Sequence, residues 1–239
     1  MRFLRTRCVG AVVVASLVAC RKHVTTDSRA GSIQLGRVSC QADSLLAFLP
    51  VDQASITSER EAIDSARQPI RRNGDTLRIP LRNGTDALLR DCRREGDDFV
   101  KFRYLGYVQR LRSHLVDVSY YEGGGYVLMA DSIGRHIWLP SPPTFAPDSA
   151  RFLVSSIDLE ANYDPNVLEI WLLGNDSVSL EFKVDGDRKW GPAEPHWTSP
   201  TVIQFWKTTI NGTDLSRDST LATIQWRDGS WRVIDAGSP

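Results

Sequence analysis

Apolar and polar residues alternate along most of the chain after Thr76, and this period of two constrains the fold more than any other feature. In the segment 100–104 the order is Val-Lys-Phe-Arg-Tyr, which is typical of a strand with one solvated face. Turn residues such as Gly123-Gly124-Gly125 and Asp228-Gly229 separate the segments. The pattern predicts an all-β antiparallel meander, and the lack of βαβ spacing disfavours a parallel-sheet enzyme fold. The expected strands after Tyr104 cover residues 114–121, 126–131, 151–157, 167–173, 178–184, 202–209, 221–226 and 231–235.

Three hairpins in this region are similar to one another. They cover residues 126–139, 169–184 and 221–234, and each joins two apolar strands through a polar turn. Their starts lie roughly 40–50 residues apart, within the range of a four-stranded repeat unit. The segment 170–173 (Ile-Trp-Leu-Leu) is apolar at every position, so we expect it to be buried on both faces.

A phrase between the first two hairpins, PPTFAPDSARFLV (142–154), resembles the P-x-F/W-S-P-D-G-x-R/K repeat of bacterial WD-type β-propellers. Phe145 matches the aromatic of that phrase, Pro147 and Asp148 match its turn, and Ser149 replaces the usual glycine. The resemblance implies a β-propeller-like stack of blade-like hairpins. The length suffices for about three to four blades in a closed or an open arrangement, and a β-sandwich is the alternative.

The N-terminus has the features of an export signal. Three arginines within residues 1–7 precede the uncharged run 8–19, which is too short to span a bilayer. Leu17-Val18-Ala19-Cys20 resembles the lipobox of bacterial lipoprotein precursors, which implies cleavage before Cys20 and acylation of that residue. Arg21 follows where lipoproteins retained in the inner membrane usually carry aspartate. The resemblance thus implies an outer-membrane lipoprotein facing the periplasm.

The expected organisation is a signal peptide over 1–19, a lipidated tether over 20–38 and one all-β domain over 39–239. The tether is polar and aperiodic. Within the domain, Ser58 and Glu61 have the spacing of a capping box, which predicts a short helix over 59–67.

Cys40 and Cys92 are the only cysteines that remain after the signal peptide and the acylated Cys20. An even remainder in an oxidising compartment predicts a disulfide between them. Two distant thiols supply only two of the four ligands that a structural zinc ion needs, and no two histidines have the spacing of metal ligands. We therefore expect no metal and no cofactor.

Charge and motifs exclude several functions. The 29 basic residues are balanced by 29 acidic ones without a basic tract, so nucleic acid is not an expected partner. The nucleophile elbow, the zinc helix and the phosphate-binding loop are all absent from the sequence. We therefore expect no catalytic residues and a protein that is not an enzyme. A periplasmic hydrolase using carboxylates, and an inhibitor or chaperone of an envelope protein, are the alternatives.

Residues 190–197 (WGPAEPHW) form the candidate binding surface. Trp190, His196 and Trp197 lie among residues that break secondary structure, which predicts aromatic side chains on a rigid loop. In the alternative, Trp197 is an inter-blade aromatic, because aligning the second copy of the repeat phrase places it on Phe145. The sequence thus favours a lipid-anchored binding or scaffold module, held to the membrane by its N-terminal lipid and recognising an envelope protein.

Overall fold

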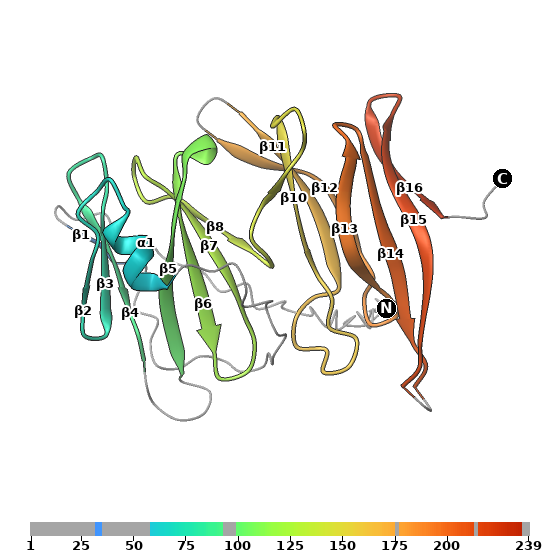
Figure 1. Cartoon of the computed structure of the whole chain (residues 1–239), viewed down its shortest axis with the longest axis horizontal. Coiled ribbons are helices and arrows are strands. Elements are labelled where there is room, and N and C mark those ends of the chain that lie inside the picture. Colours follow the sequence, from blue (N-terminus) through green and yellow to red (C-terminus); the bar gives the residue numbers. More distant parts are fainter. Residues whose placement is uncertain (1–31, 35–57, 93–98, 175–176, 213–214, 236–239) are drawn as a thin grey trace, which may run out of the picture.

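The computed structural model describes residues 32–34, 58–92, 99–174, 177–212 and 215–235, and it is an all-β structure with four four-stranded sheets (Figure 1). Sheet A consists of β1 (Ser32–Gln34), β2 (Arg71–Asn73), β3 (Thr76–Pro80) and β4 (Asp86–Arg90). Sheet B consists of β5 (Val100–Val108), β6 (Ser113–Tyr120), β7 (Gly124–Ala130) and β8 (His136–Leu139). Sheet C consists of β9 (Thr144–Phe145), β10 (Arg151–Ser156), β11 (Val167–Leu173) and β12 (Val178–Asp185). Sheet D consists of β13 (Gly191–Ser199), β14 (Val202–Ile210), β15 (Arg217–Arg227) and β16 (Ser230–Asp235).

The topology is mostly a meander. In sheets B, C and D each strand pairs antiparallel with the next strand of the chain. Sheet A adds one exception, because β1 pairs parallel to β4. This strand lies within the segment 20–38 that we expected to be a tether, so the edge of sheet A holds part of that segment.

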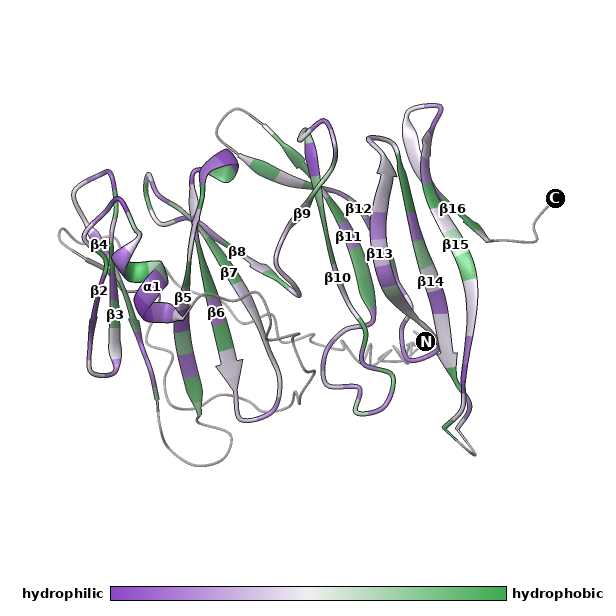
Figure 2. Ribbon diagram, viewed as in Figure 1, coloured by the Kyte–Doolittle hydropathy of each residue, from purple (hydrophilic) through white to green (hydrophobic). Residues whose placement is uncertain are grey.

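Three hydrophobic cores separate the four sheets, which follow one another in chain order along the long axis (Figure 1). The first core lies between sheets A and B, the second between B and C, and the third between C and D. Sheets B and C are therefore buried on both faces. Strand β11 shows this arrangement, because Ile170 belongs to the third core whereas Trp171 and Leu173 pack against the second. Figure 2 shows the matching alternation of hydrophobic and hydrophilic residues along the strands.

Ring closure is not found. Within the described part of the chain, no strand of sheet D pairs with a strand of sheet A. The all-β meander is thus confirmed, whereas a propeller-like arrangement of the four sheets is not. In the part of the chain that the structure describes, the two end sheets each have one face without a neighbouring sheet.

The tight turns explain several unusual residues. Asp228 and Gly229 both have positive φ (51° and 78°), as a two-residue hairpin turn requires, and the expected terminal hairpin is formed by β15 and β16. Ser149 has a φ of 59° at the position where the repeat phrase usually has glycine. Gly125 allows the backbone of β7 to lie close to the ring of Trp138, because a Cβ at this position would clash with that ring.

The predicted capping box is present. The Ser58 hydroxyl accepts from the Glu61 amide, and the Ser58 amide donates to the Glu61 carboxylate. The helix α1 (Glu59–Asp64) is shorter than the predicted 59–67, because Ser65 caps it and donates its hydroxyl to the Ala62 carbonyl.

Carboxylates close the free edge of β5. The backbone amides of Phe102 and Tyr104 donate to Asp91 and Glu59 respectively, both at 2.9 Å. Arg72 binds both carboxylates, at 3.3 Å and 2.7 Å, and also donates to the Phe102 carbonyl. Since exposed strand edges invite pairing with other chains, this cluster ends sheet B at β5.

The expectation of a rigid loop over 190–197 is corrected by the structure. Residues Gly191–Ser199 form β13, an edge strand that pairs with β14. Prolines are tolerated at a sheet edge because no ladder hydrogen bond is lost there, and Pro192 and Pro195 occupy such an edge. The register shifts between Ala193 and His196, where Glu194 has a φ of 51°.

Candidate anion-binding cavity

The three residues of the candidate binding surface do not share one face. Trp190 stacks on Phe205 at a centroid distance of 6.0 Å, and Trp197 makes an edge contact with Trp231 at 6.1 Å. Both tryptophans pack against the core between sheets C and D. The side chain of His196 is exposed, and its Nδ1 lies 3.1 Å from the Glu194 carbonyl. Trp197 therefore has the inter-sheet position of the alternative stated above.

The predicted cysteine sites are only partly described. Cys92 is buried and takes part in a disulfide. Cys40 and the lipidation site Cys20 lie outside the described residues, so the pairing of Cys40 with Cys92 and the acylation stay predictions. Among the described residues, no group of three or more His, Cys, Asp or Glu side chains could hold a metal ion.

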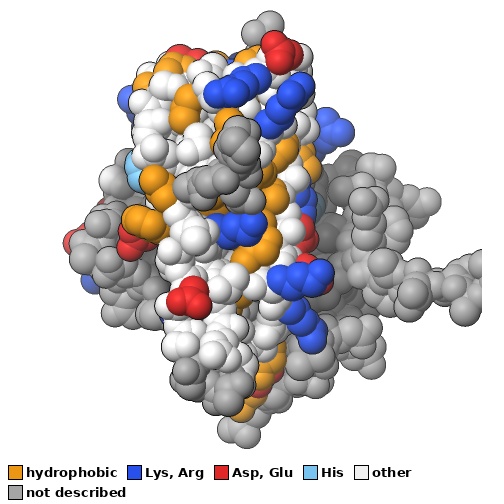
Figure 3. All heavy atoms as spheres, turned by 90° about the vertical axis from the view of Figure 1, so that its right-hand side faces the viewer, with side chains coloured by type: hydrophobic (Ala, Val, Ile, Leu, Met, Phe, Trp, Pro, Cys, Tyr) orange, Lys and Arg blue, Asp and Glu red, His pale blue; other side chains and the backbone are white. Residues whose placement is uncertain are grey.

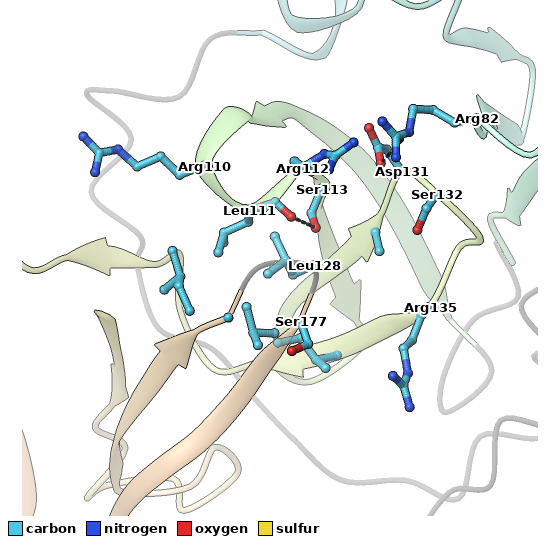
Figure 4. A pocket seen from close by; sticks show the side chains of 15 residues that line it. Arg82, Arg110, Leu111, Arg112, Ser113, Leu128, Asp131, Ser132, Arg135 and Ser177 are labelled. Atoms are coloured by element: carbon cyan, nitrogen blue, oxygen red, sulfur yellow. Dashed lines mark hydrogen bonds and ion pairs between the residues drawn. The ribbon is translucent and has the colours of Figure 1, made fainter. Parts of the chain in front are cut away.

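A cavity of about 530 Å³ opens where the ends of sheets B and C meet a turn of sheet A (Figure 4). Its lining comes from the β3–β4 turn, the connection between β5 and β6, the β7–β8 turn, and the ends of β11 and β12. Among the described residues that line it, four are arginines and one is a carboxylate, so this part of the lining has a net charge of +3. The charged lining residues are Arg82, Arg110, Arg112, Arg135 and Asp131.

The connection between β5 and β6 places two of these arginines. It contains a single 3₁₀ turn, η3 (Gln109–Leu111), which ends at Arg112 in the left-handed conformation, with a φ of 47°. The Arg112 carbonyl accepts from the Asp131 amide at 2.9 Å, and the Ser113 hydroxyl donates to the Leu111 carbonyl at 2.7 Å. These bonds fix the connection against the β7–β8 turn and hold Arg110 and Arg112 at the rim.

The one carboxylate among the described lining residues, Asp131, is already paired. Asp131 is 4% exposed, forms an ion pair with Arg82 at 3.2 Å, and accepts from the Tyr107 hydroxyl at 2.7 Å. Figure 4 shows Arg82 and Arg112 on the same side as Asp131, with Arg110 and Arg135 at opposite ends of the lining. Because Asp131 is paired with Arg82, Arg110 and Arg135 supply positive charge at the two ends of the described lining.

A buried histidine lies behind this carboxylate. His114 is 1% exposed, and its ring lies at 5.2 Å from that of Tyr107 and at hydrogen-bond distance from the Tyr104 hydroxyl, which is 3.3 Å from Nδ1. Burial lowers the pKa of His114 to about 4, so the ring is neutral at physiological pH.

Carboxylates gather in a second hollow, of about 430 Å³, at the opposite ends of the strands of sheets B and C. Asp117 and Asp164 both line it. Burial is the main cause that raises the pKa of each, and the pKa of Asp164 reaches about 6, with a further contribution from the charge of Asp158. Asp117 is paired with Arg103 at 3.2 Å. This hollow is the place where the hydrolase alternative would find its acids.

The sequence contains only a faint sign of the arginine-lined cavity. Arg110-Leu111-Arg112 interrupts the alternation between two strands, which in itself indicates a solvated turn. The other lining arginines come from turns far away in the chain, so only the fold brings them together.

Two further observations complete the description. No helix in the described segments is both long and apolar enough to cross a membrane. Comparison of the chain with protein-family models, with curated proteins and with solved structures found no match.

Proposed function

We propose that this chain is a lipid-anchored binding module of the bacterial cell envelope whose ligand carries an anionic group. The observation that carries the proposal is the cavity of about 530 Å³ whose described lining residues include four arginines and one carboxylate, which is paired with Arg82. Carboxylates and phosphates are the groups that arginine binds best, through two parallel hydrogen bonds. The ligand is therefore a molecule or peptide with clustered carboxylate or phosphate groups.

The position of the cavity suits binding. It lies among the turns at one end of the packed sheets. Binding residues are often found in such turns, because the rigid sheets hold them in place while their sequences can vary. The sheet pair beneath it is held by a core that contains Phe152, Val154, Leu115 and Leu128. A ligand thus meets a preformed cavity, which lowers the entropy cost of binding.

The location in the envelope rests on the sequence. The arginines before the uncharged run 8–19 and the lipobox-like Leu17-Val18-Ala19-Cys20 support export and acylation at Cys20. Arg21 supports the outer membrane, with the β domain on the periplasmic side. In this proposal the lipid holds the protein at the membrane, and the cavity recognises an envelope component.

The sheets are proposed to be blade-like repeats in an open stack. Phe145, next to β10, packs in the core between sheets B and C, whereas Trp197, next to β14, packs in the core between C and D. Phe152 and Ile203, which the alignment of the repeat phrase can also match, lie in the same two cores respectively. Equivalent residues thus fill successive inter-sheet spaces, which supports a repeated unit.

Calorimetric titration of the full chain in detergent tests the proposal, with inorganic pyrophosphate and citrate as probes. We expect binding that weakens as salt is added, because the ligand contacts are ionic. The double variant Arg110→Gln/Arg135→Gln should lower the affinity by about tenfold or more, since hydrogen bonds to charged groups contribute about 1.5–3 kcal/mol each.

Arg188→Gln is the matched control, because Arg188 is exposed in the turn between β12 and β13 and does not line the cavity. It should bind both probes as the wild type does. The proposal is wrong if neither probe binds the wild-type protein, or if the double variant binds them with unchanged affinity.

A further inference from the structure

Part of the lining of the arginine-lined cavity is apolar. Sheet B contributes the cross-strand pair of Leu128 and Ile137, and sheet C contributes the cross-strand pair of Leu173 and Val178. Leu111, from the turn η3, lies in the lining with them. We call these five residues the apolar lining.

The apolar lining is the open end of the core between sheets B and C. Leu128 belongs to this core and is 3% exposed, whereas the other four residues pack against the core and are only half-buried. Figure 4 shows Leu111 and Leu128 in the middle of the lining, with arginines around them. Apolar side chains thus stay accessible inside a cavity of about 530 Å³, so an apolar group of a ligand that covers them would be bound favourably.

A positive charge adjoins the apolar lining at each end of the cavity. The Arg110 guanidinium lies 5.8 Å from the centroid of the Phe145 ring, and Phe145 packs against the same core. Arg135 is exposed at the other end, two residues before Ile137. The cavity therefore combines an apolar surface with cations that lie directly beside it.

We propose that the cavity binds an amphiphilic anion with a single apolar chain. The acid group binds Arg110 or Arg135, and the chain lies along the apolar lining between them. This inference rests on the anion-binding function proposed above and adds the chemical class of the ligand.

An anion without an apolar chain uses only part of this cavity. Citrate or pyrophosphate pairs with the arginines but leaves the apolar lining in contact with water. Cavities for small molecules are mostly apolar, with a few polar groups that fix the orientation, and their usual volume of about 300–1,000 Å³ includes this one. Each methylene group that a chain buries there should tighten binding by about fourfold, which corresponds to about 0.8 kcal/mol.

A series of alkyl phosphates tests the inference. Ethyl, butyl and hexyl phosphate are titrated calorimetrically into the full chain held in nanodiscs of zwitterionic lipid, because free detergent would itself occupy an apolar site. Titration into empty nanodiscs corrects for partition into the lipid. We expect the dissociation constant to fall by about fourfold for each added methylene group. 1-Hexanol, which lacks the acid group, should bind about tenfold more weakly than hexyl phosphate, or weaker still.

Two variants of the apolar lining should remove the effect of chain length. Ile137→Thr/Val178→Thr keeps both side chains β-branched but gives each a hydroxyl group, and Leu111→Gln changes a turn residue outside the sheets. In both variants the gain per methylene group should drop below about twofold, while ethyl phosphate binds as it does to the wild type. The wild-type series tests the inference even if a variant fails to fold.

Val233→Thr is the matched control. Val233 is 37% exposed on β16 of sheet D, at the end of the molecule where Figure 3 shows hydrophobic and basic side chains together on the surface. The variant therefore controls for nonspecific binding of an amphiphilic anion to such a surface. Its affinities for the three alkyl phosphates should equal those of the wild type.

The outcomes separate this inference from the proposed function. Equal affinities for ethyl and hexyl phosphate would overturn the inference and leave the anion-binding function standing. If neither the alkyl phosphates nor pyrophosphate bind, the anion-binding function is wrong and the inference falls with it. The inference is also overturned if 1-hexanol binds as tightly as hexyl phosphate, if the gain per methylene group persists in both lining variants, or if Val233→Thr abolishes it.

Discussion

At the residue scale, His114 illustrates how the fold suppresses a charge. Burial raises the pKa of Tyr104, so its hydroxyl keeps the proton, and it lies 3.3 Å from Nδ1 of the neutral His114 ring, within hydrogen-bond distance. The other ring nitrogen, Nε2, is buried and has no hydrogen-bond partner among the described residues. A second proton would put a buried positive charge into this arrangement, and for that reason the pKa of His114 is lowered to about 4.

This pKa predicts a loss of stability in acid. Between pH 6.5 and pH 4 the unfolded chain binds a proton at His114 and the folded chain does not, so the free energy of unfolding falls as the pH is lowered. The full lowering of the His114 pKa corresponds to a loss of about 3 kcal/mol in the free energy of unfolding. Urea unfolding at a series of pH values should show that His114→Phe loses less stability than the wild type across this window.

The pKa of Asp164 is raised to about 6, so this group makes the free energy of unfolding rise as the pH is lowered, which opposes the effect of His114. The contribution of His114 is therefore obtained from the difference between the curves of His114→Phe and the wild type. The exposed His196 provides the control, and His196→Gln should follow the wild-type curve. Parallel curves for the wild type and His114→Phe would show that His114 is protonated in the folded protein.

At the element scale, the edge of β5 depends on a cluster of charges instead of a neighbouring strand. Glu59 and Asp91 accept the amide protons that another strand would otherwise take, and Arg72 holds both carboxylates in place. The Arg72 side chain is only 18% exposed. The helix α1 owes its position on sheet B to this cluster as well as to the burial of Ala62.

Removal of the Arg72 guanidinium should therefore lower the free energy of unfolding. Arg72→Met leaves two partly buried carboxylates without their partner, and breaking such a pair lowers the free energy of unfolding by about 3–5 kcal/mol. Denaturant titration should show this as a lower midpoint. Arg60→Met removes an arginine that is 92% exposed and 3.9 Å from Asp64, and it should change the midpoint little. Equal effects of the two variants would contradict the role given to Arg72.

The elements predicted best from the sequence are those whose patterns are local. Strand β11 matches the predicted 167–173, because both of its faces are apolar and turn residues bound it. The capping box of α1 is equally local. Strand β13 was missed because its prolines indicate a loop, and only the pairing with β14 overrides that signal. The arginine-lined cavity was missed because turns from three sheets form it.

At the scale of the whole molecule, stability is divided among three interfaces between neighbouring sheets. The last hairpin contributes Ala222, Ile224 and Trp231 to the core between sheets C and D. Arg151 connects this hairpin to sheet C, because it binds Glu181 at 2.6 Å and lies over the rings of Trp226 and Trp231. Glu181 also accepts from the indole of Trp231 at 2.9 Å.

Deletion of residues 221–239 should therefore unfold sheet D. Loss of a buried tryptophan alone costs about 3–5 kcal/mol, and the remaining β13–β14 hairpin is too small to be stable by itself. We expect a lower melting temperature, with amide protons of β3 and β6 still protected from exchange, because sheets A and B keep their own core. Deletion of residues 236–239 is the control. An unchanged melting temperature after the longer deletion would show that the hairpin is an appendage.

The order of the sheets also determines how the molecule would respond to mechanical load. Sheet A lies at one end of the stack and sheet D at the other, so a pull between the two end sheets acts on the three cores in series (Figure 1). In a series arrangement the weakest interface separates first, while the others remain intact. A stretched molecule would lengthen in discrete steps, one sheet at a time, and could yield at one end without losing the turns that surround the arginine-lined cavity.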